Sequence, residues 1–445
     1  MWTVVKNISV IGTGYLGATH AAGMAELGFD VLGVDVDPEK IEKLSRGDLP
    51  FHEPGLPELI RRHVDSGRLR FTADVSEVGD WADVHFVAVG TPQLPGSNGA
   101  DMTYVDAAIT DLARVITRDS LIVGKSTVPV GTARRLADLL HERSRDDVDV
   151  ALAWNPEFLR EGLAVQDTLR PDRLVVGAER DEDVETLREV YAEALGRETP
   201  WIATDFETAE LVKVAANAFL ATKISFINAF SEVTETVGGD IRTLADALGH
   251  DTRIGRKFLN AGVGFGGGCL PKDIRALQSR VSELGLDHTM RFLSEMDQIN
   301  LRRRERAVTL SEQMLGGDLE DRRVAVLGVS FKPLSDDVRD SPGLDVANRL
   351  YVAGAHVAVY DPEGGANAAK RFPRLDYCPS MEDAVREADL VVLTTEWDEF
   401  KALTPADLDG LVAQRRLLDA RNVLTSAEWK DAGWDFAQLG RLYEG

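Results

Sequence analysis

The sequence predicts an α/β protein in which two domains with parallel sheets are joined by a central helical domain containing one long helix. A buried strand, Lys6–Ile11, runs into three spaced glycines and an Ala-rich helix. Over Thr204–Thr236 apolar residues recur with helical spacing, and from Arg323 strands alternate with helices again. Both sheet domains are therefore expected to be Rossmann-like.

Length, charge and cysteine content limit the classes of protein to which the chain can belong. Its 445 residues exceed what one hydrophobic core usually organises, and we expect three domains over residues 1–203, 204–304 and 305–445. A net charge of −24 argues against binding to nucleic acid or an anionic membrane, because both require a basic surface. Cys269 and Cys378 lie in unlike contexts, so no disulfide is expected. With no signal pattern and no apolar run of membrane length, the expected location is the cytoplasm.

The first strand and the turn after it carry the pattern of a dinucleotide site. The turn consists of Gly12, Thr13, Gly14, Tyr15, Leu16 and Gly17. A second strand, Phe29–Val34, ends in Asp35, at the distance expected for a carboxylate that binds the adenosine ribose. Asp35 would accept a hydrogen bond from a 2′-hydroxyl and repel a 2′-phosphate. The expected cofactor is therefore NAD rather than NADP.

Three later strands end in polar loops, and in a parallel sheet such loops gather at the edge that binds ligands. The strands and the residues that follow them are Ala82–Val89 with Thr91, Leu121–Lys125 with Thr127, and Val148–Trp154 with Asn155–Gly162. For any one loop the simpler interpretation is ordinary loop chemistry, with Thr127 as a helix cap and Glu157 and Glu161 as solvated acids. Their repetition at successive strand ends favours a functional edge.

The sheet pattern ends near Thr204, which with Glu207 fits a capping box at the start of a long helix. Lys213 and Asn217 are four residues apart and share one face of this helix. A surface lysine and a tolerated asparagine would be the simpler interpretation, but asparagine is a poor helix former in an otherwise apolar stretch. Because a long apolar helix has more than one stripe to bury, we also expect a homodimer or a higher homo-oligomer.

A glycine-rich segment, Gly262–Asp273, interrupts the central helices and contains Cys269. Glycine at this density allows backbone N–H groups to approach a bound phosphate or sugar. Lys272 would favour the thiolate of Cys269, which is the nucleophilic form of the side chain. The alternative is a glycine-rich turn with a structural cysteine, because cysteine often serves as a small apolar residue.

The C-terminal part of the chain repeats the order of the first domain without its three-glycine turn. Arg323–Gly328 is expected to be a strand, and His356–Tyr360 a second strand that is followed by Asp361. Without the glycine pattern the sequence does not indicate a site for a second dinucleotide. It indicates a site for a different nucleotide. Lys332 and Arg339 could reach its phosphates, and a solvated charged loop is the alternative.

Five motifs follow one another along nearly the whole chain. They are Gly12–Gly17, Ser126–Pro129, Asn155–Gly162, Gly264–Asp273, and Phe331–Pro333 with Asp337–Pro342. In these motifs the sequence resembles the UDP-glucose/GDP-mannose 6-dehydrogenase family. The resemblance implies an N-terminal NAD domain, a central helical dimerisation domain and a C-terminal domain for a nucleotide sugar. It also implies two successive oxidations, from the primary alcohol of UDP-glucose to the carboxylate of UDP-glucuronate, with two NAD⁺ consumed per sugar.

By this resemblance the site residues fall into three groups, and no metal is implied. The catalytic residues would be Cys269, Lys213, Asn217, Asp273, Glu161 and Thr127. Cys269 would carry a thiohemiacetal and then a thioester, and Glu161, with Thr127 ordering the water, would serve its hydrolysis. NAD would contact the glycine turn and Asp35, and also Lys40, Thr91, Thr127, Glu161, Lys272 and Arg339. The nucleotide sugar would contact Glu157, Phe158, Leu159, Lys213, Asn217, Phe258, Leu259, Gly266 and Lys332, and also Arg253 from a neighbouring subunit.

The sequence departs from the family pattern at two positions. Gly268 stands where many members have Ser or Thr, which could alter the loop around the thiol. Asn260 stands where others have a basic or larger polar residue, which bears on the preferred nucleotide sugar; GDP-mannose is the alternative substrate. A two-electron hydroxyacid dehydrogenase would share Lys213 and Asn217 without needing Cys269, and a non-catalytic nucleotide sensor would tolerate loss of the thiol.

Overall fold

The computed structural model describes residues 5–444, which divide into two compact units. Unit 1 comprises the described residues up to Ala216 together with Arg275–Gly285. Unit 2 comprises Asn217–Ile274 and the described residues from Leu286 onward. Two helices, α9 and α11, continue from one unit into the other. The division into three domains stays a prediction.

Unit 1 is built on an eight-stranded sheet with the order β3-β2-β1-β4-β5-β6-β7-β8. The strands are β1 Asn7–Ile11, β2 Asp30–Val34, β3 Leu69–Thr72, β4 Val84–Val87, β5 Ser120–Gly124, β6 Val150–Trp154, β7 Leu174–Ala178 and β8 Trp201–Thr204. Neighbouring strands are parallel except β6 and β7. The order reverses between β1 and β4, which is where a Rossmann-like sheet binds its ligand.

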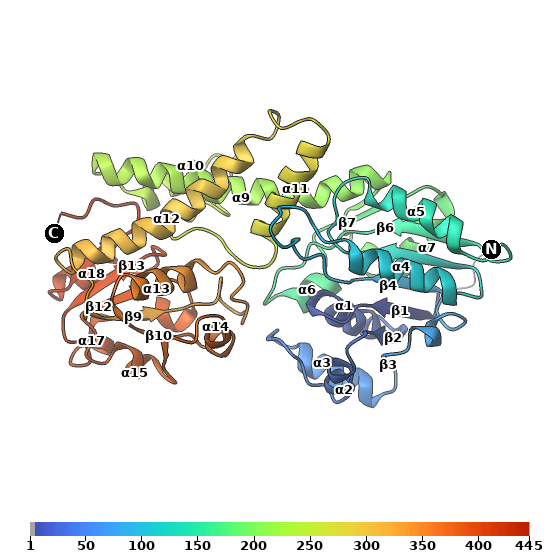
Figure 1. Cartoon of the computed structure of the whole chain (residues 1–445), viewed down its shortest axis with the longest axis horizontal. Coiled ribbons are helices and arrows are strands. Elements are labelled where there is room, and N and C mark those ends of the chain that lie inside the picture. The colour runs from blue at the N-terminus through green and yellow to red at the C-terminus, as the bar shows by residue number, and fades with distance from the viewer. Residues whose placement is uncertain (1–4, 445) are drawn as a thin grey trace. The chain divides into compact units, whose positions relative to one another are not determined.

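The helices of unit 1 cover its sheet and bury two apolar cores (Figure 1). They are α1 Tyr15–Glu26, α2 Pro38–Ser45, α3 Leu56–Asp65, α4 Thr103–Val115, α5 Thr132–Arg143, α6 Ala164–Leu169, α7 Asp181–Val190 and α8 Ala192–Leu195, with a 3₁₀ turn at Val75–Val78. Successive side chains of a strand point to opposite faces, so Ile8 and Val10 of β1 enter one core and Ile11 enters the other. The sheet is therefore packed against an apolar core on each of its two faces.

Helix α9, Phe206–Val237, has 32 residues and confirms the predicted long helix. The predicted capping box is wrong. Thr204 ends β8, and the side chain of Asp205 accepts a hydrogen bond from the backbone N–H of Thr208 at 2.6 Å. Asp205 therefore caps the helix one residue later than predicted, because a carboxylate is the better acceptor for the first N–H groups.

Unit 2 contains a six-stranded parallel sheet with the order β11-β10-β9-β12-β13-β14. The strands are β9 Arg323–Leu327, β10 His356–Tyr360, β11 Asp376–Tyr377, β12 Leu390–Leu393, β13 Arg416–Asp419 and β14 Asp435–Gln438. The helices that lie wholly in this unit are α10 Ile241–Gly249, α12 Phe292–Met314, α13 Pro342–Val352, α14 Gly365–Arg371, α15 Met381–Val385, α16 Asp398–Lys401, α17 Pro405–Leu408 and α18 Ser426–Asp431. Helix α11, Leu270–Glu283, begins in unit 2 and continues into unit 1. Together the two sheets and the intervening helices confirm the predicted fold class.

Helix α12 runs beside the unit 2 part of α9 (Figure 1). Glu235 of α9 accepts from Arg303 and from Arg306, at 2.7 Å in each case. The side chains of Arg303 and Glu235 are almost fully buried, so the helices are joined by a desolvated ion pair as well as by apolar contacts. Helix α12 also packs against β12 and β13 of the sheet of unit 2.

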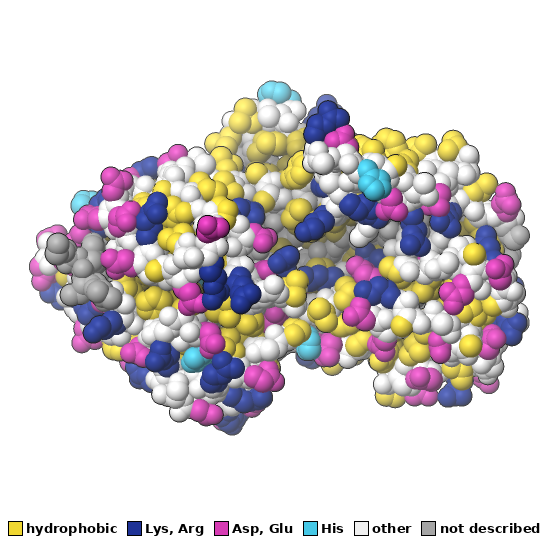
Figure 2. Space-filling model, turned by 180° about the vertical axis from the view of Figure 1, so that it is seen from behind, with side chains coloured by type: hydrophobic (Ala, Val, Ile, Leu, Met, Phe, Trp, Pro, Cys, Tyr) yellow, Lys and Arg dark blue, Asp and Glu magenta, His cyan; other side chains and the backbone are white. Residues whose placement is uncertain are grey.

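The charged residues are spread over the surface despite the large net negative charge. On the face shown in Figure 2, acidic and basic side chains are interspersed with apolar ones. No helix among residues 5–444 has the length and apolar character needed to span a bilayer.

Candidate active site

The turn between β1 and α1 has the geometry that a bound dinucleotide requires. Gly12 has a φ of 88°, and a Cβ there would lie 2.8 Å from the side chain of Val89. A Cβ on Gly17 would lie 1.7 Å from the carbonyl oxygen of Gly12. Neither position accepts a side chain. Gly14 has open space around it, which leaves room for a phosphate beside the backbone at the start of α1.

Asp35 follows β2 directly and is buried. Its Oδ2 accepts from the backbone N–H of Thr13 at 2.9 Å and from Nζ of Lys40 at 2.8 Å. Burial alone would raise the pKa of Asp35, but these donors outweigh it and hold the pKa below its usual value. The carboxylate is therefore ionised at neutral pH and tied to the glycine turn. Lys40, expected near the adenosine, lies against Asp35 itself.

Polar residues join the ends of β4 and β5. The hydroxyl of Thr91 donates to the carbonyl oxygen of Thr127 at 2.8 Å. The hydroxyl of Ser126 donates to the carbonyl oxygen of Val89 at 2.7 Å. Thr127 lies well before Gly131, the N-cap residue of α5, so the interpretation of Thr127 as a helix cap is wrong. Two of the predicted cofactor contacts, Thr91 and Thr127, are thus held together.

Glu210 of α9 caps α5 instead. Its carboxylate accepts from the backbone N–H groups of Gly131 and Ala133, at 2.7 Å in each case. Burial raises the pKa of Glu210 to about 7, against the lowering effect of these hydrogen bonds. The contact ties the loop that carries Thr127 to the helix that carries Lys213, and it was not predicted from the sequence.

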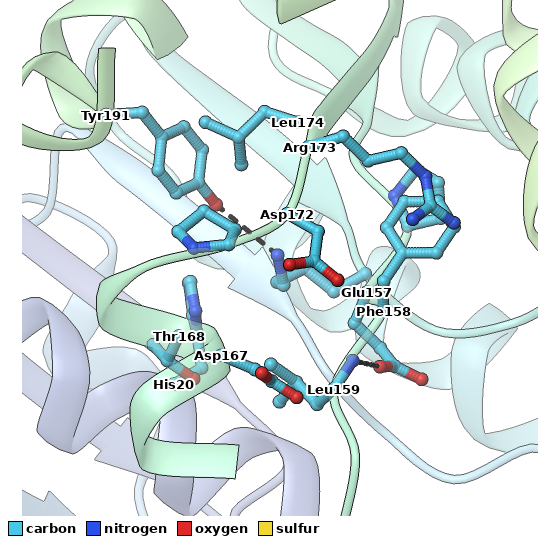
Figure 3. A pocket seen from close by; sticks show the side chains of 13 residues that line it. His20, Glu157, Phe158, Leu159, Asp167, Thr168, Asp172, Arg173, Leu174 and Tyr191 are labelled. Carbon is cyan, nitrogen blue, oxygen red and sulfur yellow. Dashed lines mark hydrogen bonds between the residues drawn. The ribbon is translucent and has the colours of Figure 1, made fainter. Parts of the chain in front are cut away.

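Lys213 is 5% exposed, and its Nζ lies 2.9 Å from Oε1 of Glu157. The other oxygen of Glu157 accepts from the backbone N–H of Leu159 at 2.6 Å (Figure 3). The carboxylate is therefore held at both oxygens. The ring of Phe158 has Lys213 Nζ 5.7 Å from its centroid and the Arg173 guanidinium carbon 3.8 Å away. Glu157 is not the solvated acid of the simpler interpretation, and three predicted substrate contacts meet at the end of β6.

A buried lysine lies behind this loop. Lys125 is 6% exposed, and its Nζ donates to Oδ1 of Asn155 at 2.9 Å and to the hydroxyl of Tyr191 at 3.3 Å. Burial lowers the pKa of Lys125 to about 8. Lys125 and Tyr191 line a cavity of about 40 Å³ with His20 and Phe158 (Figure 3). Lys125 was predicted only as part of a strand.

In unit 2, Cys269 is exposed and directly precedes α11. Its carbonyl oxygen accepts the backbone N–H of Asp273 at 2.9 Å. The carboxylate of Asp273 is 3% exposed, accepts from Nδ2 of Asn217 at 2.7 Å and lies 2.7 Å from Nζ of Lys272. The hydrogen bond to Asp273 accounts for the asparagine in α9. Three predicted catalytic residues, Cys269, Asp273 and Asn217, are therefore close together.

Gly268 accommodates Arg339. A Cβ on Gly268 would lie 2.2 Å from the central carbon of the Arg339 guanidinium. Asp337 holds both partners, because it accepts from the backbone N–H of Gly268 at 3.3 Å and from Arg339 at 2.7 Å. The glycine that departs from the family pattern thus lets a cation lie against the loop before Cys269.

Unit 2 has a cavity of about 420 Å³ beside this loop. Its lining includes the predicted residues Phe258, Gly266 and Lys332, together with Ile224, Lys257, Asn260, Gly264, Phe265, Leu270, Phe331, Glu396 and Arg421. Arg421 donates to the carbonyl oxygens of Thr394 at 2.7 Å and Gly264 at 3.0 Å. Arg421 follows β13, so the strand-end argument used for unit 1 could have identified it.

Leu259 and Arg253, two further predicted substrate contacts, do not line this cavity. Leu259 is 2% exposed and lines an adjoining cavity of about 270 Å³ with Arg242 and Arg256. The side chain of Arg253 is 87% exposed and pairs with Asp251 at 2.6 Å. Contact of Arg253 with a neighbouring subunit stays a prediction. Within residues 5–444 no group of three or more metal-ligating side chains is arranged to hold a metal ion.

The glycine turn, the ionised carboxylate at the end of β2 and the lysine–glutamate pair at the end of β6 define the cofactor half of a nicotinamide-dependent dehydrogenase. Three models of the UDP-glucose/GDP-mannose dehydrogenase family match the chain: the NAD binding domain over residues 6–195, the central domain over 207–302 and the UDP binding domain over 325–426. The chain belongs to this family, and NAD is its cofactor.

Relatives along the full length agree with this assignment. The chain is 41% identical to the UDP-glucose 6-dehydrogenase of Rhizobium meliloti (strain 1021), covering 98% of this chain and 99% of the relative. It is 38% identical to the UDP-glucose 6-dehydrogenase YwqF of Bacillus subtilis (strain 168), with 98% of each covered. The structure of a UDP-glucose dehydrogenase from the hyperthermophilic archaeon Pyrobaculum islandicum superimposes with a TM-score of 0.90 at 36% identity, with 98% of each chain covered.

Proposed function

We propose that this enzyme oxidises UDP-glucose at C6 to UDP-glucuronate in two successive steps, each of which reduces one NAD⁺. The observation that carries the proposal is the arrangement at the start of α11, where exposed Cys269 stands one turn before an Asp273 carboxylate bonded to Asn217. A dehydrogenase that stops at the carbonyl has no need of a thiol there. The names of the full-length relatives support UDP-glucose as the substrate.

The first step converts the primary alcohol to an aldehyde. The hydroxyl proton is lost as hydride leaves C6, so a base or a base-linked water is required, and Asp273 serves this purpose with Asn217 orienting it. The positive charge of Lys213 stabilises the developing oxyanion. Glu157, whose Oε1 lies 2.9 Å from Nζ of Lys213, holds this ammonium group in place. Bound NAD⁺ supplies the hydride acceptor.

In the second step C6 of the sugar is bound covalently to the enzyme. The thiolate of Cys269 adds to the aldehyde carbon to give a thiohemiacetal. Loss of the hydroxyl proton and transfer of hydride from that carbon to a second NAD⁺ then give a thioester. Water then adds to the thioester carbonyl, the carbon–sulfur bond breaks, and the acid and the thiol are released. Glu161 accepts the proton of this water, and Thr127, held by Thr91, orients it.

The remaining assignments concern binding. The glycine turn and Asp35 hold NAD, with Lys40, Lys272 and Arg339 as further contacts. Phe258, Gly266 and Lys332 line the cavity of about 420 Å³ and bind the nucleotide sugar. The other proposed substrate contacts are Glu157, Phe158, Leu159, Lys213, Asn217 and Leu259. The basic side chains of the cavity suit the two phosphates of a nucleoside diphosphate.

The protein acts as at least a dimer joined through its central helices. Helix α9 exposes a row of apolar side chains that includes Phe219, Phe226 and Val233, which are 65%, 46% and 53% exposed. The ring centroids of Phe226 and Phe230 are 4.8 Å apart. A two-fold contact between copies of α9 is the commonest way to cover such a surface. It would also bring Arg253 toward a neighbouring copy.

The number of NADH released per sugar tests the function. Purified protein is incubated with limiting UDP-glucose, and in parallel with GDP-mannose, with excess NAD⁺ in both cases. The expected result is two NADH per UDP-glucose and UDP-glucuronate as product. Faster turnover of GDP-mannose would reassign the substrate within the family. One NADH per sugar would indicate a two-electron dehydrogenase, and none would indicate a nucleotide sensor.

A further inference from the structure

A buried carboxylate in unit 1 joins two parts of the site that the sequence treats separately. Glu53 lies in the loop between α2 and α3 and is 2% exposed. Its Oε2 accepts from the backbone N–H of Gly162 at 2.6 Å, and its Oε1 accepts from that of Ala164 at 2.7 Å. The hydroxyl of Tyr15 also donates to Oε2. Burying a carboxylate costs free energy unless it is fully hydrogen-bonded, and these neutral donors fulfil that condition.

The two backbone donors belong to the segment that carries Glu161. Gly162 has a φ of 78°, so the chain turns sharply right after Glu161, and α6 begins at Ala164. The N-cap residue of α6, Leu163, makes no side-chain capping hydrogen bond. Glu53 supplies that cap from a loop more than 100 residues away in sequence. Glu53 therefore holds the backbone directly after Glu161.

The third donor belongs to the dinucleotide turn. Tyr15 is the first residue of α1, and its ring packs on Phe51 with the centroids 5.0 Å apart. Its hydroxyl donates to Glu53 and accepts from the N–H of Gly162 at 3.2 Å. Burial, reinforced by Glu53, raises the pKa of Tyr15, so the phenol keeps its proton and remains a donor. A hydrogen-bond chain thus runs from the start of α1 through Glu53 to the Glu161 segment.

We infer that Glu53 is a positioning residue for thioester hydrolysis, which holds the Glu161 segment in register with the dinucleotide turn through Gly162, Ala164 and Tyr15. The inference rests on the proposed role of Glu161 in accepting the proton of the hydrolytic water. Glu53 is buried and bonded to groups of its own unit, so it acts through the segment that it holds. Its loss therefore affects the last step of the reaction more than the binding of NAD⁺ or the two hydride transfers.

Glu53→Gln tests the inference at nearly constant volume. The amide has one accepting oxygen, and its NH₂ group would face the N–H of Gly162 or Ala164, so the segment loosens. We expect a burst of NADH, a steady-state rate lower by roughly tenfold, and an acyl adduct on Cys269 visible by intact mass during turnover. The dissociation constant of NAD⁺ should change by less than about threefold. Glu58→Gln, an exposed glutamate of α3, is the matched control and should change none of these.

Two further variants separate the inference from the function on which it rests. Glu161→Gln should accumulate the same adduct, and adding Glu53→Gln to it should slow hydrolysis little further, because both changes act on one step. Tyr15→Phe removes one donor and should give a smaller accumulation, which keeps the inference testable if Glu53→Gln folds poorly. If Glu161→Gln accumulates the adduct and neither of the other variants does, Glu53 is only structural and the inference is wrong. If Glu161→Gln forms no adduct, the assigned role of Glu161 fails and the inference fails with it.

Discussion

Asp35→Ser should weaken the preference of the enzyme for NAD⁺ over NADP⁺. The carboxylate of Asp35 is buried, ionised and next to the glycine turn, which is where the adenosine ribose binds in this fold. A 2′-phosphate would place like charge against it. Serine keeps a hydroxyl that can accept from the N–H of Thr13 but removes the charge. The same change leaves Lys40 without the carboxylate that it contacts at 2.8 Å.

The size of the effect follows from the charges involved. Two like unit charges about 4 Å apart near a protein surface repel by about 4 kcal/mol. In the native protein Nζ of Lys40 lies 2.8 Å from Oδ2 of Asp35, and its positive charge offsets part of this repulsion. A net penalty of roughly 2 to 3 kcal/mol remains, so the ratio of kcat/KM for the two cofactors should narrow about 30- to 150-fold. Adding Lys40→Gln to Asp35→Ser should restore part of the preference for NAD⁺, because Lys40 would otherwise attract the 2′-phosphate of NADP⁺.

The assay is the initial rate of reduction of each cofactor at saturating UDP-glucose. Asp30→Ser is the matched control, because Asp30 is exposed at the opposite end of β2. It should leave the cofactor ratio unchanged. Equal activity of the native protein with both cofactors, or an unchanged ratio in Asp35→Ser, would refute the argument that charge at this position selects the cofactor.

The remaining predictions concern the thiol, the assembly and the buried lysine. Cys269→Ser should bind NAD⁺ and UDP-glucose but lose turnover by roughly a thousandfold or more, since an alcohol is a far weaker nucleophile near neutral pH; near-native formation of UDP-glucuronate would contradict the thioester route. Light scattering at assay concentrations should show at least a dimer, and Phe226→Glu should dissociate it; a monomeric native protein would rule out the α9 contact. Burial lowers the pKa of Lys125 to about 8, so the unfolded chain binds more protons than the folded chain above that pH and the unfolding free energy should rise with pH. Urea unfolding should show this contribution, at most about 3 kcal/mol between pH 8 and 10.5, in the native protein and not in Lys125→Met.

The sequence predicted those features that depend on local pattern. The glycine turn and Asp35 were found because spacing along the chain alone determines the strand, the turn and the second strand. Lys213 and Asn217 were found because residues four apart share a helical face. The start of α9 was misplaced because two capping patterns overlap there, and a preference scale does not decide between Thr204 and Asp205 when both precede the same helix.

The features missed from the sequence are contacts between side chains and distant backbone. Glu53 bonds to residues more than 100 positions away, and Glu210 caps a helix nearly 80 positions earlier. Glu53 lies in a loop and Glu210 on the predicted long helix, and an isolated glutamate in either setting is most often solvated. Asn217 was recognised as unusual, but its partner Asp273 lies 56 residues further on. Such pairs are fixed by tertiary packing, which a pattern along the chain does not encode.

Asp35 and Asp361 occupy equivalent positions in the two units but have different roles. Each follows the second strand of a parallel sheet. In Asp361 one oxygen accepts from the N–H groups of Val329 and Ser330, at 2.6 and 2.8 Å, and the other accepts from Gly364 at 2.7 Å, from Glu363 and from the hydroxyl of Ser330. In Asp35 the second oxygen has a single described donor, the N–H of Asp37 at 3.1 Å. An oxygen with one donor can still accept from a ribose hydroxyl, whereas both oxygens of Asp361 are occupied by their own unit. The first carboxylate therefore suits a ligand, and the second holds a loop in place.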